Sequence, residues 1–250
     1  MIEAFLHGKL SRKQTNMEDL LTSCFFGLLM LDKPSDGLFQ FLADAIDPFG
    51  EPSHPLRMLQ EAEFDDANVK YMFWPKWDEP GCRACEPDLV LEIENSHSRI
   101  VVVVEAKYKS PKSSFGDITK DMPNDQLARE WDNLFELENR RSDGLFLVYL
   151  TADVGVPRNE IRDSIEDCKR FRKSSVRPKI LALSWRQAGP CLAGSSINQK
   201  LNQFMTHLGL TYFCGVHVPE VSPIKWTFDG LLSSWEIKNR SINWSWSSNE

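Results

Sequence analysis

Two short, strongly apolar runs near the middle of the chain predict a β-hairpin. The first run is Leu89–Ile93 and the second is Ile100–Val104, and the polar segment between them is typical of a turn. The second run is apolar at every position, which is the pattern of a central strand buried on both faces. We therefore expect these two strands to lie side by side in the middle of a sheet.

The rest of the pattern predicts helices and strands on both sides of this hairpin. Apolar residues recur with helical spacing before it, and alternating helical and apolar segments follow it. A strand, a helix and a second strand in this order imply a right-handed crossover, so the strand after the hairpin should run parallel to Ile100–Val104. The expected elements are helices near 17–31 and 38–46, a strand at 69–74, the hairpin, a helix near 125–140, a strand at 145–150, a helix near 157–173 and a strand at 180–185.

This order predicts an α/β fold in which helices flank a mixed central sheet, with the order αβββαβ in its core. The chain has 250 residues, enough for one large domain or for a core with an extension. We expect a core over residues 1–185 and a C-terminal extension over 186–250. The extension holds Trp226, Trp235, Trp244 and Trp246, which is more apolar than disorder permits, and we expect it to pack on the core.

Charged residues stand where the two hairpin strands begin and end. Asp88 precedes the first strand, and Glu105 and Lys107 close the second. Side chains alternate along a strand, so Glu105 and Lys107 share one face, and antiparallel pairing brings Asp88 next to Glu105. Two facing carboxylates form a hard-oxygen site for Mg²⁺ or Mn²⁺, and a neighbouring ammonium can orient water. The alternative is a solvated strand end with an exposed Glu–Lys pair.

The sequence Pro87-Asp88, followed by Glu105-Ala106-Lys107 across a hairpin, resembles the Pro-Asp…(Asp/Glu)-x-Lys signature of the restriction-endonuclease-like, or PD-(D/E)XK, nuclease superfamily. This resemblance implies that Asp88, Glu105 and the carbonyl of Ala106 hold Mg²⁺ or Mn²⁺ and that Lys107 positions the attacking water. It also implies a restriction-endonuclease-like core.

Two further residues match positions that act in parts of this superfamily. Glu18, in the first turn of the first helix, resembles an acidic residue that reaches the metal. Its alternative role is to interact with the helix dipole. Gln126 resembles a glutamine on the helix after the Glu-x-Lys strand, and its alternative role is to begin that helix. Some members carry a tyrosine four residues after this glutamine, where this chain has Glu130.

The net charge of −7 argues against a protein that simply coats nucleic acid. Only one dense basic segment is present, with six positive charges between Lys169 and Lys179. Its residues Lys169, Arg170, Arg172 and Lys173 are candidates for contacts with backbone phosphates. The alternative is a helix C-terminus whose dipole favours cations.

The six cysteines are expected to be reduced, because a chain of this size needs no disulfides. Cys82 and Cys85 have zinc-knuckle spacing, but no second pair completes a site, so two small buried residues in a turn are expected instead. No apolar run is long enough to cross a bilayer, and Met1–Arg12 lacks a signal-peptide core. A cytoplasmic location is expected.

The sequence thus predicts a metal-dependent nuclease that hydrolyses phosphodiester bonds, with DNA expected over RNA. A partner protein could supply its specificity, as in restriction or phage-defence systems. The alternative is a catalytically inert protein that uses the same fold to bind nucleic acid or to assemble with other proteins.

Overall fold

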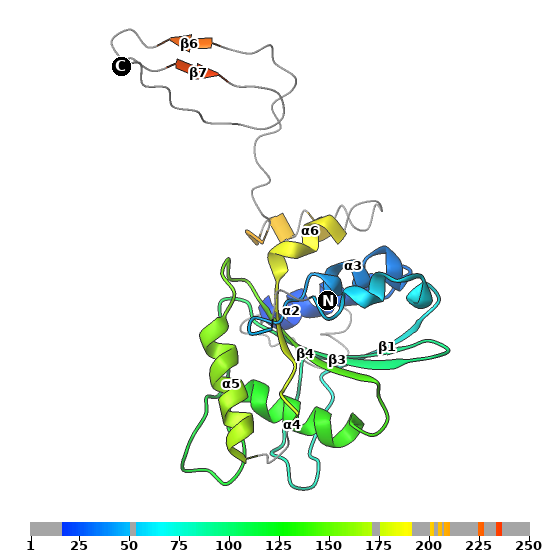
Figure 1. Cartoon of the computed structure of the whole chain (residues 1–250), viewed down its shortest axis with the longest axis vertical. Helices are drawn as coiled ribbons and strands as arrows, with labels where there is room; N and C mark the ends of the chain where they lie inside the picture. Colours follow the sequence, from blue (N-terminus) through cyan, green and yellow to red (C-terminus); the bar gives the residue numbers. More distant parts are fainter. Residues whose placement is uncertain are drawn as a thin grey trace. The chain divides into compact units, whose positions relative to one another are not determined.

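The computed structural model describes residues 17–50, 54–171, 176–191, 201–202, 205–206, 208–210, 225–227 and 234–236. The chain divides into two compact units, Met1–Tyr212 and Phe213–Glu250. In the second unit, the described residues form the strands β6 (Lys225–Thr227) and β7 (Ser234–Glu236), which pair antiparallel. The first unit contains the central sheet and the helices that cover it (Figure 1).

The sheet of the first unit has five strands in the order β1-β2-β3-β4-β5. β1, β2 and β3 pair antiparallel, whereas β3, β4 and β5 pair parallel. The hairpin and the parallel crossover predicted from the sequence are therefore confirmed. The strands are β1 (Asn68–Phe73), β2 (Leu89–Glu94), β3 (Arg99–Ala106), β4 (Gly144–Thr151) and β5 (Ile180–Ser184).

Helices cover both faces of this sheet, as expected for an α/β protein. Figure 1 shows α2 and α3 on one side of the strands and α4 and α5 on the other. The α-helices are α2 (Met17–Leu29), α3 (Leu38–Ala43), α4 (Gln126–Glu138), α5 (Arg158–Phe171) and α6 (Ala188–Cys191). Short 3₁₀ turns lie at η1 (Pro34–Asp36), η2 (Arg57–Gln60), η3 (Ala62–Phe64) and η4 (Trp185–Gln187).

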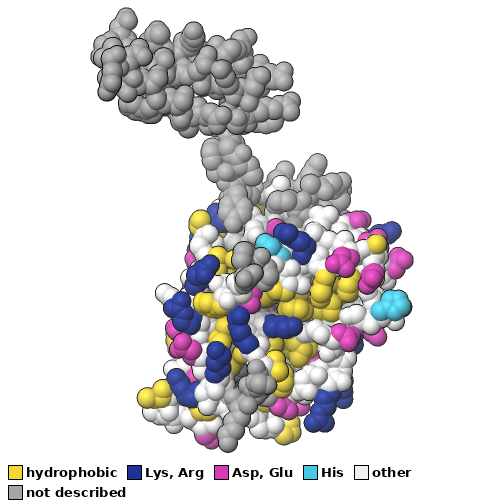
Figure 2. All heavy atoms as spheres, viewed as in Figure 1, with side chains coloured by type: hydrophobic (Ala, Val, Ile, Leu, Met, Phe, Trp, Pro, Cys, Tyr) yellow, Lys and Arg dark blue, Asp and Glu magenta, His cyan; other side chains and the backbone are white. Residues whose placement is uncertain are grey.

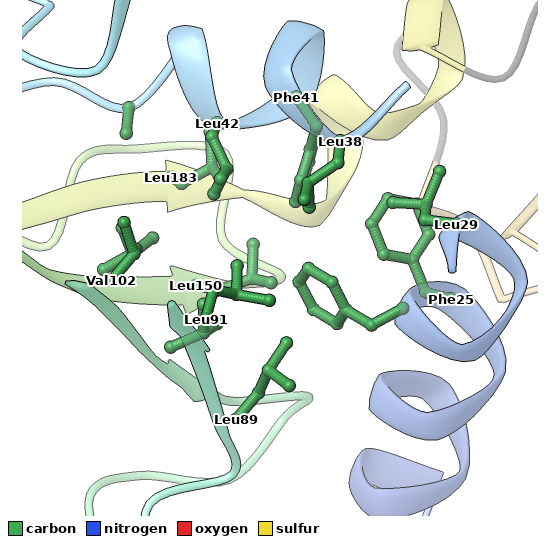
Figure 3. Packing of buried hydrophobic residues seen from close by; sticks show 14 of the residues in the cluster. Phe25, Leu29, Leu38, Phe41, Leu42, Leu89, Leu91, Val102, Leu150 and Leu183 are labelled. Atoms are coloured by element: carbon green, nitrogen blue, oxygen red, sulfur yellow. The ribbon is translucent and has the colours of Figure 1, made fainter. Parts of the chain in front are cut away.

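The two faces of the sheet have separate apolar cores, which explains why β3 and β4 are apolar at consecutive positions. Val102 and Val104 face the core that contains α2 and α3, where Phe25 and Phe41 pack edge to face (Figure 3). Val101 and Val103 face the second core, formed with α4 and α5. Burial on both faces removes a large apolar area from water and holds β3 at the centre of the sheet.

The helix expected over 38–46 ends earlier than predicted, at Ala43. Ile46 instead forms an antiparallel bridge with Ala182 of β5, with hydrogen bonds of 2.9 and 2.8 Å in the two directions. The backbone leaves the helix because this bridge covers the outer edge of β5, where donors and acceptors would otherwise lack partners.

Residues after 185 also take part in the core of the first unit. Ala188, Leu201, Met205 and Leu210 are buried in the cluster that contains α2 and α3. The extension predicted from residue 186 therefore begins inside this unit, which runs to Tyr212. The fold otherwise follows the predicted order of elements. Within the ranges that the structure describes, no helix combines the length and apolarity needed to cross a membrane.

Candidate functional site

Three charged side chains meet where β2 begins and β3 ends. Leu89 of β2 pairs with Val104 of β3, which places Asp88 beside Glu105. Asp88 Oδ2 accepts a hydrogen bond of 2.9 Å from the backbone N–H of Ala106, and Lys107 Nζ lies 2.6 Å from Glu105 Oε1. Asp88, Glu105 and Lys107 are 8%, 2% and 7% exposed. The alternative of a solvated strand end with an exposed Glu–Lys pair is therefore wrong, because Glu105 and Lys107 are both buried.

The local pattern of β2 and β3 produces this arrangement. Val90, Val101 and Val103 face the core with α4 and α5. Because side chains alternate along each strand, Asp88 and Glu105 continue the same face beyond these valines. The carboxylates thus stand at the end of an apolar surface that fixes the backbone beneath them.

Helix α4 contributes two more polar groups to the site. Asp125 caps its N-terminus by accepting hydrogen bonds from the backbone N–H groups of Leu127 (3.1 Å) and Ala128 (3.3 Å). The next residue, Gln126, donates its side-chain amide to Glu105 Oε1. Glu130 follows one turn later and is 1% exposed, close enough to interact with both Gln126 and Glu105.

Glu18 reaches the same edge from α2, on the other side of the sheet. Its Oε1 accepts a hydrogen bond of 3.2 Å from Lys107 Nζ, and its Oε2 accepts one of 2.8 Å from the backbone N–H of Tyr108. The hydroxyl of Ser110 also donates to Oε2. Glu18 therefore holds the backbone that leaves β3, and it shares Lys107 with Glu105.

Burial and mutual repulsion change how these groups hold protons. Burial, together with the neighbouring Glu105 carboxylate, raises the pKa of Asp88 well above its usual range. Burial and repulsion by Glu130 raise the pKa of Glu105 in the same direction, and burial raises the pKa of Glu130 to about 8. Burial disfavours the charge on Lys107, but the carboxylates of Glu105, Asp88 and Glu18 outweigh it and raise its pKa above the ordinary value. The site thus crowds carboxyl groups that tend to keep their protons, and one ammonium offsets their mutual repulsion only in part.

The chemistry of the donors fits a hard divalent cation. Glu105 Oε2 and Glu130 Oε2 are buried, and neither has a hydrogen-bond partner among the described residues. A buried oxygen without a partner is costly, and a bound cation would satisfy it. The part of the chain that the structure describes contains no group of three or more His, Cys, Asp or Glu arranged to hold a metal ion. A cation held here by Asp88 and Glu105 would need backbone carbonyl and water oxygens to complete its coordination, as Mg²⁺ commonly does.

The sequence analysis assigned Asp88, Glu105, Lys107, Gln126 and Glu18, and the structure brings all five together. The sequence analysis did not assign Glu130 to the site. The signal that could have identified Glu130 is its four-residue spacing from Gln126, which places both residues on one face of the helix. The sequence analysis gave Lys112 no role, and the structure shows that this lysine is buried.

The predicted nucleic-acid contacts are only partly described by the structure. Lys169 and Arg170 lie in the last turn of α5, and Arg170 Nη1 forms an ion pair of 3.1 Å with Asp167 Oδ1. Arg172 and Lys173 lie outside the described residues. Cys82 is buried, and Cys85 is a free thiol that accepts a 3.4 Å hydrogen bond from the Asn133 side-chain amide.

Comparisons with known proteins add little to this geometry. No protein-family model matches the chain, and no curated protein matches it. One solved structure, that of Pyrococcus furiosus SfsA in complex with Ca²⁺, aligns with a TM-score of 0.26 and 16% sequence identity. The alignment covers 49% of this chain and 49% of that one. A similarity at this level carries no argument about function, which must come from the site itself.

Proposed function

We propose that this chain is a metal-dependent nuclease that hydrolyses phosphodiester bonds in DNA, with its site at the edge where β2 begins and β3 ends. The observation that carries this proposal is the meeting of Asp88, Glu105 and Lys107, three buried charged groups, at one strand end. The resemblance of these residues to the Pro-Asp…(Asp/Glu)-x-Lys signature gives the reaction class.

Each residue has a role that follows from its surroundings. Asp88 and Glu105, with the carbonyl of Ala106 by the same resemblance, would hold Mg²⁺ or Mn²⁺. Such an ion lowers the pKa of bound water and withdraws charge from a phosphate oxygen. Lys107 Nζ, held between Glu105 Oε1 at 2.6 Å and Glu18 Oε1 at 3.2 Å, would orient the attacking water and stabilise charge that develops on the phosphate.

Gln126 and Glu18 would support these groups rather than react. The amide of Gln126 donates to Glu105 Oε1. Since Lys107 also bonds to this oxygen, Glu105 Oε2 is left as the oxygen that can face a cation. Glu18 fixes the backbone N–H of Tyr108 and so limits motion of the chain next to Lys107.

The visible surface is compatible with a polyanionic substrate although the chain is acidic. In Figure 2, Lys and Arg side chains gather toward the side on which Figure 1 shows α5, and Asp and Glu are more frequent on the opposite side. Positive charge on one side of an acidic protein can hold a phosphate backbone. DNA is proposed over RNA from the resemblance alone, and a partner protein would supply specificity if the isolated chain cuts without sequence preference.

The test is cleavage of plasmid and linear DNA by the purified chain with Mg²⁺, with Mn²⁺ and with a chelator. We expect cleavage with either ion and none with the chelator. Asp88→Asn and Lys107→Met should each lower the rate by at least about 10²-fold, because each removes a group that acts on the reacting atoms.

A matched control is Lys70→Met, which breaks the exposed 3.1 Å ion pair with Glu92 away from the site and should leave the rate unchanged. Binding of DNA without cleavage under every metal condition would instead favour the inert nucleic-acid-binding module.

A further inference from the structure

The connection between β3 and α4 contains a buried charge that the proposed reaction does not use. This segment, Lys107–Asp125, links the end of β3 to the start of α4. Connections of this length usually lie at the surface and are variable in structure. Lys112 does not follow this rule, because its side chain and that of Asp125 are both 0% exposed.

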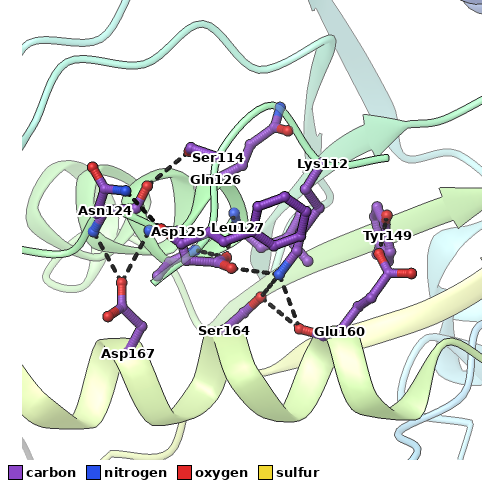
Figure 4. Close-up of polar contacts among 12 residues, drawn as sticks. Lys112, Ser114, Asn124, Asp125, Gln126, Leu127, Tyr149, Glu160, Ser164 and Asp167 are labelled. Atoms are coloured by element: carbon purple, nitrogen blue, oxygen red, sulfur yellow. Dashed lines mark hydrogen bonds and ion pairs between the residues drawn. The ribbon is translucent and has the colours of Figure 1, made fainter. Parts of the chain in front are cut away.

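Every proton of the Lys112 ammonium has an acceptor (Figure 4). The group forms an ion pair with Asp125 Oδ2, and it donates hydrogen bonds to Ser164 Oγ at 2.9 Å and to the carbonyl of Glu160 at 3.1 Å. Asp125 belongs to the N-terminus of α4, and the other two acceptors belong to α5. A single side chain therefore fixes the connection to both helices on this face of the sheet.

The residues next to this ion pair lead directly to the candidate site. The backbone N–H of Ser113 donates a hydrogen bond of 2.7 Å to Gln126 Oε1, and the N–H of Gln126 donates one of 3.2 Å to the carbonyl of Ser114. Since Oε1 accepts from Ser113, the amide nitrogen of Gln126 must point the other way, toward Glu105 Oε1. The position of Ser113 thus selects the orientation of the Gln126 amide.

A buried ion pair of this kind is a poor source of net stability. Removing two charges from water costs several kcal/mol per ion, and apolar residues of similar volume often stabilise a protein equally well. The geometric effect is more specific, because groups that orient the ligands of a metal site alter affinity and rate without touching the ion.

We infer that Lys112 is a positioning residue: it holds Ser113 and the N-terminus of α4 so that the amide of Gln126 faces Glu105. The contacts that carry this inference stand independently of the proposed function, and only its metal-binding test rests on that function. The chain of contacts runs from Lys112 through Asp125 and Ser113 to Gln126, and from there to Glu105.

The first measurement needs neither metal nor substrate. In NMR spectra of the metal-free protein, the side-chain amide of Gln126 should have a proton shifted strongly downfield, because it donates to a carboxylate, and should exchange slowly. Lys112→Met should move that signal toward the position of a solvated glutamine. An unchanged Gln126 signal in a folded Lys112→Met protein would overturn the inference.

The second measurement is Mn²⁺ affinity in a double-mutant cycle. Lys112→Met and Gln126→Leu should each weaken Mn²⁺ binding by about 10-fold or more, the usual cost of losing a group that orients a ligand. The double variant should be no weaker than Gln126→Leu alone, because both changes remove one chain of contacts. Independent, multiplicative losses would count against the positioning role.

The controls separate positioning from general destabilisation. Arg99→Met removes ion pairs with Glu92 and Glu138 at the opposite end of β3, so it should lower stability and leave both the Gln126 signal and Mn²⁺ affinity unchanged. If Lys112→Met does not fold, Ser164→Ala, which removes one of the three acceptors, takes its place with a smaller expected shift in the same direction. If the parent protein binds no Mn²⁺, the proposed function fails, and the NMR measurement alone decides the inference.

Discussion

At the scale of single residues, the site depends on carboxylates that are too crowded to be fully ionised without a cation. Glu105 lies against Asp88 and Glu130 and accepts from Lys107 and Gln126 through one oxygen only. Its second oxygen is buried without a partner in the described structure. An arrangement of this kind lowers stability, as is common at functional sites, and the proposed cation would relieve the repulsion.

We expect Glu105→Gln to abolish metal-dependent cleavage and to leave the metal-free protein equally or more stable. A glutamine keeps an oxygen that can accept from Lys107 and Gln126, while the repulsion by neighbouring carboxylates is removed, a gain on the order of 1 kcal/mol. Chemical denaturation with chelator, alongside the cleavage assay, measures both effects. A large loss of stability would show instead that the Glu105–Lys107 pair is mainly structural.

The residues of the hairpin could be predicted from the sequence by a local rule, whereas the buried Lys112 could not. Alternation along two strands is a local rule, and it placed Asp88 next to Glu105 without further information. The place of Lys112 depends on contacts between elements far apart in the chain. A lysine in a polar segment has no local feature that indicates burial, since its acceptors Glu160 and Ser164 come from a helix 48 and 52 residues later in the chain.

At the scale of elements, α5 joins the apolar core to the basic segment. Ile161 and Ile165 face the sheet, and the last turn of the helix carries Lys169 and Arg170. Asp167, in the same helix, accepts hydrogen bonds from the backbone N–H groups of Asn124 and Asp125, at 2.9 and 3.0 Å. The ion pair between Arg170 and Asp167 therefore places this arginine beside the start of α4, the helix that carries Gln126.

We expect weaker DNA binding, to a similar extent for all DNA sequences, when alanine replaces all three of Arg170, Arg172 and Lys173. Each lost phosphate contact should flatten the dependence of log affinity on log salt by up to about 0.9, because fewer condensed counterions are released. The rate at saturating DNA should be retained, since these residues are not among the groups proposed to hold the metal or to orient the water. Fluorescence anisotropy over a salt series measures the slope. An unchanged slope with intact affinity would mean that these cations only stabilise the C-terminus of the helix through its dipole.

The limits of helices were harder to predict than their existence. The apolar pattern over 38–46 does not distinguish a helix from a helix followed by a bridge. The outer edge of β5 decides between them, because Ile46 completes hydrogen bonds there. The end of this helix therefore depends on pairing with β5 and not on the local sequence pattern.

At the scale of the whole molecule, the buried carboxyl groups should make stability depend on pH. Asp88, Glu105 and Glu130 have raised pKa values in the folded state, so between their unfolded pKa values and their folded ones the native protein holds protons that the unfolded chain has lost. The free energy of unfolding must then decrease as pH rises, from about pH 4.5 to about pH 8 for Glu130. The raised pKa of Lys107 does not alter this slope, because that group stays charged throughout the window.

We expect the metal-free protein to become less stable from pH 5 to pH 8, and Glu130→Gln to flatten this trend by up to about 1.4 kcal/mol per pH unit. Mn²⁺ should restore stability most at the higher pH, where the carboxylates have released their protons. Urea unfolding at several pH values, with chelator and with Mn²⁺, measures these changes. A parent protein that gains stability from pH 5 to pH 8 would show that these carboxyl groups are not raised in pKa.

The contact between Glu18 and the backbone N–H of Tyr108 joins residues 90 positions apart in the chain. A bond across such a separation forms only after the loops between its ends have closed, which slows folding and makes the bond a late event. It also gives the amide proton of Tyr108 a particular value as a probe, because that proton can exchange with solvent only when the start of α2 separates from the end of β3. Its exchange rate in heavy water therefore reports the free energy of opening this one contact. That free energy lies between the value for local fraying and the value for global unfolding.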